Sequence, residues 1–131
     1  MKAPSDLKYT KNDEWIRVKD NVGVVGITDY AQDQLSDVVF VEIVAFEGDE
    51  LDQGETFAVV ESVKAAADVY MPVSGKVIDI NEDLVDSPEL VNEDPFGDGW
   101  LARIKPADMN EWDELLDVEA YKKVVEEEQD A

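Results

Sequence analysis

Residues 57–72 decide the fold, and they run Phe57-Ala58-Val59-Val60-Glu61-Ser62-Val63-Lys64-Ala65-Ala66-Ala67-Asp68-Val69-Tyr70-Met71-Pro72. Residues 57–61 and 68–71 are rich in β-branched and aromatic side chains, which favour extended strands. Pro72 ends the second strand, because proline cannot donate to a sheet ladder. The residues that flank Lys64 are mostly small, so we predict that the two strands join there in a turn.

Further strands are predicted on both sides of this segment from alternating or β-branched patterns. They cover residues 14–19, 22–27, 38–44, 76–80 and 100–105. The pair Asp20-Asn21 separates the first two strands and is typical of a tight hairpin turn. Thr28 or Asp29 can cap a short helix near residue 30. The residues of that helix expected to face inward are Tyr30, Ala31 and Leu35.

The C-terminal part changes from strand periodicity to helix periodicity. Residues 81–99 are rich in Asn, Asp, Pro and Gly, which predicts a long loop. Asp108 and Glu111 have the spacing of a capping box at the start of a helix. The apolar face of that helix would be Trp112, Leu115 and Leu116.

A second C-terminal helix is predicted to begin at Asp117. Its apolar residues are Val118, Tyr121, Val124 and Val125, and residues 126–131 are expected to fray. Several short strands followed by helices predict an α+β fold built on a compact β-sandwich or barrel.

The length of 131 residues indicates one domain with one hydrophobic core. We expect a single domain over residues 1–131, with a core sandwich at about 14–105 and C-terminal helices at about 108–128. Hydrophobic residues make up 44% of the chain, so it should fold rather than stay disordered. No run of about 20 apolar residues is present, so no membrane span is expected.

The chain has no cysteine and no histidine. This composition excludes disulfides, thiolate nucleophiles, histidine bases and zinc sites with nitrogen or sulfur ligands. Redox or group-transfer chemistry would therefore depend on a cofactor. The first residues lack an apolar signal core and an Arg-rich transit pattern, which makes the cytoplasm of a prokaryote the expected location.

Acidic residues dominate the charge, with 33 Asp and Glu against 11 Lys and Arg, a net charge of −22. Such a surface repels nucleic acid and anionic membranes and favours basic protein partners and a monomer. Mutual repulsion weakens as salt shortens the Debye length, so we expect a halophilic protein of a high-salt cytoplasm. An acidic protein of an ordinary cell is the alternative.

Lys64 is the candidate functional residue, as a covalent attachment point. Attachment requires a projecting lysine, small neighbours and a rigid backbone, and Ala65, Ala66 and Ala67 supply the small neighbours. Two other interpretations are a solvated lysine on a helical turn and a strand-edge charge that blocks aggregation. A catalytic Schiff-base lysine is disfavoured, because a strongly negative surface keeps the ammonium charged.

Residues 61–75 resemble the lipoyl-lysine segment of the H-protein family of the glycine cleavage system. The resemblance continues in one register over nearly the whole chain. It includes Leu7-Lys8-Tyr9, Asp13-Glu14-Trp15, Val25 to Gln32, Leu35, Leu90-Val91-Asn92, Pro95, Gly99-Trp100-Leu101 and Ile104-Lys105-Pro106. Biotin carriers typically have Met on both sides of the lysine, where this chain has Val63 and Ala65. Lipoyl domains of 2-oxo acid dehydrogenases usually have Asp before the lysine.

The resemblance implies a barrel-sandwich hybrid of the lipoyl/biotinyl-carrier type, with lipoate in amide linkage to Lys64. It implies a non-catalytic shuttle that receives an aminomethyl group from a pyridoxal-phosphate glycine decarboxylase. A tetrahydrofolate-dependent aminomethyltransferase would take the one-carbon unit, and dihydrolipoamide dehydrogenase would reoxidise the arm. A lipoylating enzyme is a fourth implied partner. A chain without cysteine also avoids mixed disulfides with such an arm.

The resemblance also implies polar contacts for the loaded arm. Glu14 and Asp68 match positions whose carboxylates could accept hydrogen bonds from the amine. Asn12 stands where the family commonly has serine. Glu61 is a candidate for recognition by the lipoylating enzyme, and no metal site is expected, since the acids of residues 94–98 lack EF-hand spacing. Two alternative functions stay open: a lipoyl-relay or regulatory homologue, and an unmodified acidic scaffold.

Overall fold

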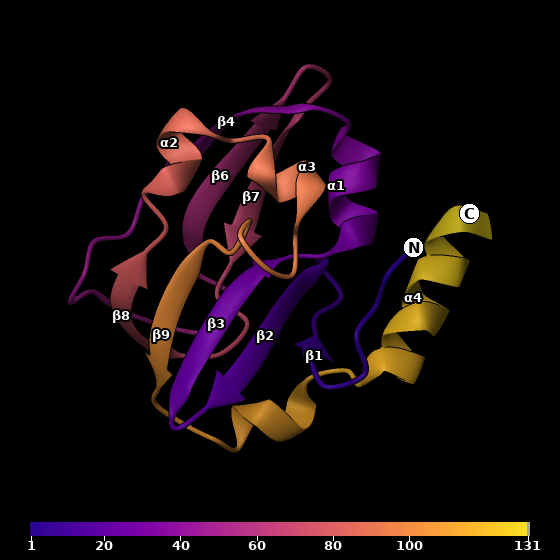
Figure 1. Cartoon of the computed structure of the whole chain (residues 1–131). Helices are drawn as coiled ribbons and strands as arrows, with labels where there is room; N and C mark the ends of the chain where they lie inside the picture. Colours follow the sequence, from indigo (N-terminus) through magenta and orange to yellow (C-terminus); the bar gives the residue numbers. More distant parts are fainter. Residues whose placement is uncertain (131) are drawn as a thin grey trace.

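The structure, a computed structural model that describes residues 1–130, contains two antiparallel β-sheets with helices around them (Figure 1). The six-stranded sheet has the order β1 (Lys8–Tyr9), β2 (Glu14–Lys19), β3 (Val22–Ile27), β9 (Ala102–Pro106), β8 (Gly75–Ile80), β5 (Glu50–Leu51). The three-stranded sheet has the order β4 (Val38–Ile43), β6 (Thr56–Ser62), β7 (Ala66–Tyr70). The predicted β-sandwich with a few helices is confirmed, with two sheets that do not close into a barrel.

The predicted turns and strands of the N-terminal half agree with the structure. Asp20 and Asn21 have φ angles of 53° and 66°, the left-handed conformation that Asp and Asn tolerate in a two-residue hairpin. Thr28 caps α1 (Asp29–Leu35), because its side chain accepts a hydrogen bond from the Ala31 amide. Tyr30 and Leu35 are buried on the inward side of this helix.

Residues 81–99 are not a plain loop, which corrects the sequence prediction. They contain the short helices α2 (Asp83–Asp86) and α3 (Leu90–Glu93). Each helix places one apolar residue in the core, Leu84 at 1% exposure and Val91 at 0%. Burial of these two side chains stabilises the helical turns. The many Asn, Asp and Pro residues of the segment favour a loop in the sequence-based prediction.

The first predicted C-terminal helix is only the 3₁₀ turn η1 (Glu111–Glu114). The capping-box prediction is wrong, because the Glu111 carboxylate instead accepts hydrogen bonds from the Ser74 amide and hydroxyl, at 2.7 and 2.9 Å. The second helix, α4 (Val118–Asp130), agrees with the prediction, and Asp117 accepts from the Ala120 amide at its start. It continues to Asp130, so fraying from residue 126 is not seen, and Ala131 lies outside the described residues.

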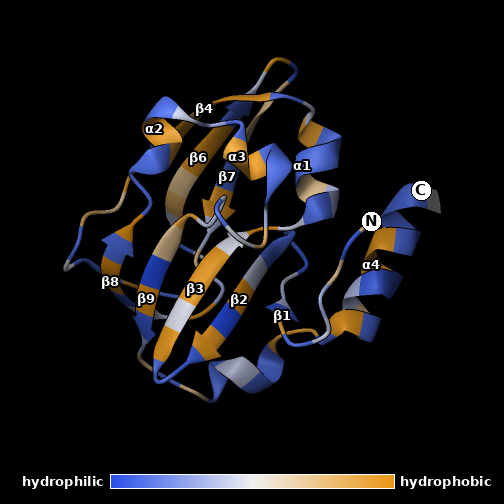
Figure 2. Ribbon diagram, viewed as in Figure 1, coloured by the Kyte–Doolittle hydropathy of each residue, from blue (hydrophilic) through white to orange (hydrophobic). Residues whose placement is uncertain are grey.

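Two hydrophobic clusters stabilise the protein. The larger cluster lies between the sheets and includes Ile16, Val25 and Ile104 of one sheet and Phe57 and Val60 of the other. The apolar residues of these strands stand out in Figure 2. The smaller cluster packs α4 against the first strands and comprises Leu7, Tyr9, Trp15, Tyr30, Tyr121 and Val125. None of the helices in residues 1–130 is long and apolar enough to cross a membrane.

Candidate functional site

Lys64 lies in the turn that joins β6 to β7, as the sequence predicts. The strands pair up to Glu61 and Ala66, and the Ser62 amide donates to the Ala65 carbonyl at 2.8 Å to close the turn. The Val63 amide donates to the carbonyl of Asp37 at 3.1 Å, which ties the turn to the start of β4. The side chain of Lys64 is exposed and therefore accessible to a modifying enzyme.

Ser62 organises the backbone around Lys64, a role that sequence reasoning missed. Its hydroxyl oxygen accepts hydrogen bonds from the amides of Lys64 and Ala65, at 3.1 and 2.9 Å. The hydroxyl also lies 3.1 Å from the Ala65 carbonyl, to which it can donate. This local Ser turn restricts the conformations from which Lys64 projects.

A cleft begins next to Lys64. The Lys64 ammonium lies 3.5 Å from the carbonyl oxygen of Gln34, in the last turn of α1. Gln34 is also part of the wall of a cavity of about 190 Å³. The other lining residues are Asn12, Asp13, Glu14, Ile27, Ala31, Leu35, Val60, Ala67, Asp68 and Val69. The Lys64 side chain therefore lies beside one wall of this cavity.

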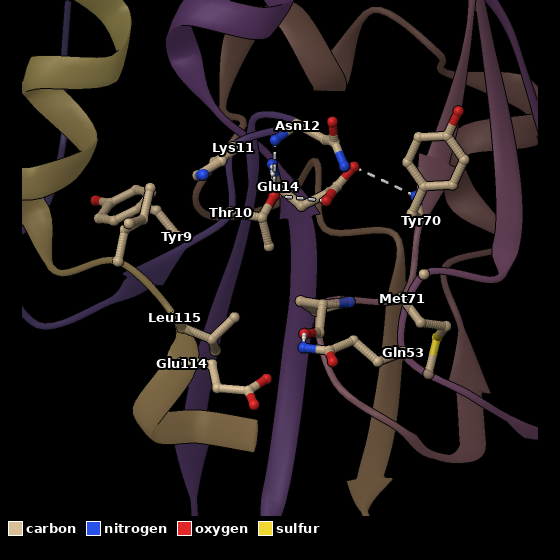
Figure 3. Close-up of a pocket in the computed structure, with 13 residues that line it drawn as sticks. Tyr9, Thr10, Lys11, Asn12, Glu14, Gln53, Tyr70, Met71, Glu114 and Leu115 are labelled. Atoms are coloured by element: carbon tan, nitrogen blue, oxygen red, sulfur yellow. Dashed lines mark hydrogen bonds between the residues drawn. The ribbon is translucent and has the colours of Figure 1, made fainter. Parts of the chain in front are cut away.

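Glu14 is the buried acid of the cleft, with only 1% of its surface exposed. One carboxylate oxygen accepts from the Thr10 hydroxyl at 2.6 Å, and the other accepts from the Tyr70 amide at 3.3 Å. Figure 3 shows the carboxylate between these two groups. Burial raises the pKa of Glu14 to about 7, although both hydrogen bonds act in the opposite direction. This acid therefore titrates near neutral pH.

The predicted site residues do not all lie together. Glu14, Asp68 and Asn12 line the same cavity, with Lys64 beside it, so the structure brings four of the singled-out positions into one region. Asp68 is exposed on β7, in contrast to the buried Glu14. Glu61 is not part of the cavity wall and lies exposed beside the turn, opposite Ala66.

A second cavity, of about 250 Å³, also has Glu14 in its wall (Figure 3). It is lined by Tyr9, Thr10, Lys11, Asn12, Glu14, Gln53, Gly54, Tyr70, Met71, Pro72, Glu114, Leu115 and Leu116. The turn of residues 10–13 therefore contributes to the walls of both cavities. Sequence reasoning did not assign a role to Thr10 or Asp13, although Asn12-Asp13 is a recognisable turn signal.

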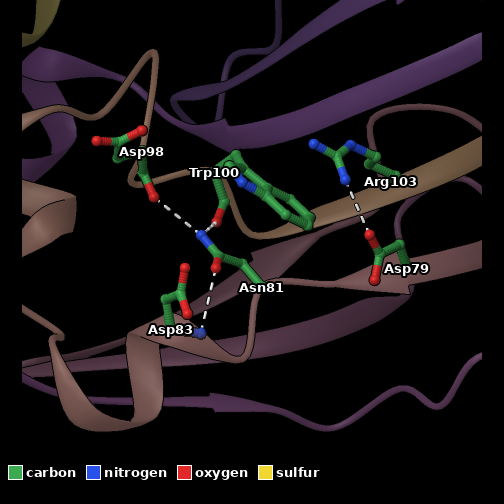
Figure 4. Close-up of polar contacts among 6 residues, drawn as sticks. All are labelled: Asp79, Asn81, Asp83, Asp98, Trp100 and Arg103. Carbon is green, nitrogen blue, oxygen red and sulfur yellow. Dashed lines mark hydrogen bonds and ion pairs between the residues drawn. The ribbon is translucent and has the colours of Figure 1, made fainter.

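Hydrogen bonds from Asn81 organise the loop of residues 94–100. The Asn81 amide donates to the carbonyls of Asp98 and Trp100, at 2.9 and 2.8 Å, as Figure 4 shows. Nearby, Arg103 pairs with Asp79 at 2.8 Å and stacks over Trp100 at 4.2 Å. Within residues 1–130 no group of three or more His, Cys, Asp or Glu residues is placed to hold a metal ion.

Comparison with known proteins identifies the family of this chain. The family model described as Glycine cleavage H-protein matches residues 7–128. The chain belongs to the glycine cleavage H-protein family. It is 54% identical to the glycine cleavage system H protein of Carboxydothermus hydrogenoformans, with 96% of each chain covered. Its identity to the protein of the same name from Symbiobacterium thermophilum is 56%, over 91% of this chain and 92% of the relative.

A solved structure agrees with this assignment. The crystal structure of a glycine cleavage system H protein from Mycobacterium marinum superposes with a TM-score of 0.80 at 34% sequence identity, covering 91% of this chain and 95% of that one. The family resemblance predicted from the sequence and the predicted fold are both confirmed. The chain is thus a carrier component of the glycine cleavage system, as the resemblance implied.

Proposed function

We propose that Lys64 bears lipoate in amide linkage and that this chain moves the aminomethyl group of glycine between the enzymes of the glycine cleavage system. The observation that supports it best is the place of Lys64, which is exposed on a hairpin turn with its ammonium 3.5 Å from the carbonyl oxygen of Gln34, a residue that lines the cleft. When bound, lipoate supplies a disulfide that accepts the aminomethyl group together with two electrons. The residues of the chain present, shelter and release the arm.

The cleft fits an arm that ends in an amine. Its apolar wall, with Ile27, Leu35 and Val60, suits the hydrocarbon part of the arm. Its buried acid, Glu14, suits a positively charged end, because an ammonium nearby would favour the ionised carboxylate. Asp68 adds a second carboxylate at the same cavity. Shelter from water in such a cleft would slow hydrolytic loss of the aminomethyl group.

The proposed partners are four enzymes. Glycine decarboxylase loads the arm, aminomethyltransferase unloads it and dihydrolipoamide dehydrogenase reoxidises it. A lipoylating enzyme that recognises Glu61 attaches the arm to Lys64. The chain itself would catalyse none of these steps, because it only transports the reacting group. We further assign residues 1–131 to one lipoyl-carrier domain that works as a monomer in a salt-rich prokaryotic cytoplasm.

Intact mass spectrometry tests the attachment site. The protein is incubated with lipoate, ATP and a lipoate ligase, and a lipoyl mass increment is expected in the native chain and in Lys76→Arg. No increment is expected in Lys64→Arg. Lys76 is a matched control because it is an exposed lysine on a strand, away from the turn. An increment that persists in Lys64→Arg would refute the proposed site.

A second assay separates the glycine cleavage shuttle from a lipoyl relay. The lipoylated protein is mixed with glycine, the decarboxylase, the aminomethyltransferase and tetrahydrofolate. Formation of methylenetetrahydrofolate is expected only with the lipoylated form. A relay protein would take up lipoate in the first assay and support no turnover in the second.

A further inference from the structure

Tyr121 of α4 lies against the turn and helix that form two walls of the Lys64 cleft. Its side chain is fully buried, and its ring stacks on Tyr9 with centroids 4.6 Å apart and planes 8° from parallel. Its hydroxyl group lies 2.7 Å from the Thr28 hydroxyl and donates to the Asp13 carboxylate at 2.9 Å. One phenol therefore contacts two segments that are distant in sequence.

One hydrogen-bond partner, Asp13, lines the cleft, and the other, Thr28, caps the helix that supplies another part of its wall. Asp13 is in the turn that precedes Glu14 and has a φ angle of 68°, a conformation that needs support from its surroundings. Thr28 is the N-cap of α1, whose residues Ala31, Gln34 and Leu35 form the opposite wall. The Thr28 amide also donates to the Asp13 carbonyl at 2.9 Å. The Tyr121 hydroxyl thus stands at the junction of the two walls.

The hydroxyl group is not required for packing. The apolar cluster of Leu7, Tyr9, Trp15, Tyr30 and Val125 would hold a phenylalanine ring equally well. A buried hydroxyl must instead be satisfied by partners, and here one partner, Asp13, lines the cleft and the other, Thr28, caps a helix of its wall. Burial raises the pKa of Asp13 to about 6, and the hydrogen bond from Tyr121 opposes this rise by favouring the carboxylate.

We infer that Tyr121 is a positioning residue for the arm cleft, because its hydroxyl joins the 10–13 turn to the start of α1. The inference builds on the proposed function, in which the cleft shelters the aminomethyl-loaded arm. Loss of the hydroxyl frees the turn that leads into Glu14, while the ring stack keeps α4 in place. The cleft then opens more often, and water reaches the arm.

The decisive variant is Tyr121→Phe, and its matched control is Tyr9→Phe. The control removes the other hydroxyl of the same ring stack, which bonds to Pro4 and not to the cleft. The full-length proteins are lipoylated, loaded from glycine by the decarboxylase and separated from it. Formaldehyde release is then followed well below the unfolding temperature. We expect release about fivefold faster in Tyr121→Phe, as the loss of one ordinary hydrogen bond allows, and an unchanged rate in Tyr9→Phe.

Equal rates in Tyr121→Phe and the native chain would overturn the inference. So would the same acceleration in Tyr9→Phe, because that result would point to loosened packing. Amide hydrogen exchange on the unmodified proteins gives a readout that needs no glycine chemistry. Thr28 and Glu14 amides are expected to exchange faster in Tyr121→Phe only, and unchanged exchange there also refutes the positioning role. A native chain that is lipoylated but cannot be loaded would refute the proposed function instead.

Discussion

At the scale of single residues, Ser62 controls how Lys64 is presented. Its hydroxyl accepts from the Lys64 and Ala65 amides, so Ser62→Ala leaves the turn with more conformations. We expect the kcat/KM of lipoylation to fall about tenfold, since the ligase must select one pose of the lysine. Initial rates of lipoyl incorporation measure this. Ser62→Thr retains the hydroxyl and should restore most of the rate, and a native rate in Ser62→Ala would contradict the prediction.

Glu14 makes the folding stability of the protein depend on pH. Its pKa is raised from 4.5 to about 7 in the folded state, so folding favours the protonated carboxyl. The contribution of Glu14 to the free energy of unfolding is therefore fully present below pH 4.5 and is lost as the pH rises to about 7. At about 1.4 kcal/mol per pH unit, the loss amounts to about 3 kcal/mol.

Glu14→Gln removes this titration and keeps the shape of the side chain. Its unfolding free energy should vary less between pH 5 and pH 8 than that of the native chain. Urea denaturation at several pH values measures the difference. Asp13, whose pKa is also raised, stays in both proteins and leaves a smaller slope of the same sign. Parallel curves for the two proteins would show that Glu14 does not titrate in this range.

At the scale of elements, periodic strands were predictable and context-dependent helices were not. The strands around Lys64 have β-branched patterns that local propensity alone explains, and the structure places them within one or two residues of the prediction. The helices α2 and α3 form because Leu84 and Val91 find space in a core made by distant strands. Glu111 likewise has a better partner in Ser74, far along the chain, than in its own helix start.

The same distinction applies to the site. The turn that holds Lys64 was predictable from the neighbouring sequence, because a turn between two strands is local. The junction of Tyr121 with Asp13 and Thr28 spans 108 and 93 residues of sequence. No spacing or propensity encodes such a contact, so Tyr121 could only be predicted as an apolar residue of its helix. The burial of Glu14 could not be predicted for the same reason, because the residues that surround its side chain come from several elements.

At the scale of the whole molecule, negative charges without a basic partner dominate the electrostatics. Within residues 1–129, whose side chains the structure describes, the ion pairs are Arg17–Asp6, Arg103–Asp79 and Lys122–Glu119, and their side chains are all exposed. Exposed pairs of this kind contribute little to stability. A chain with 33 acidic residues therefore folds against substantial self-repulsion.

Salt should stabilise the protein by screening this repulsion. We expect the melting temperature to rise by about 5 °C or more between 0.1 and 2 M KCl, as the Debye length falls from about 10 Å to below 3 Å. Calorimetry at several salt concentrations measures the effect. Glu127→Lys is an informative comparison, because the last turn of α4 has no basic residue and is the negative end of the helix dipole. This variant should melt higher at low salt and gain less from KCl. If both proteins gained equally, general salting-out would explain the stabilisation and charge repulsion would not.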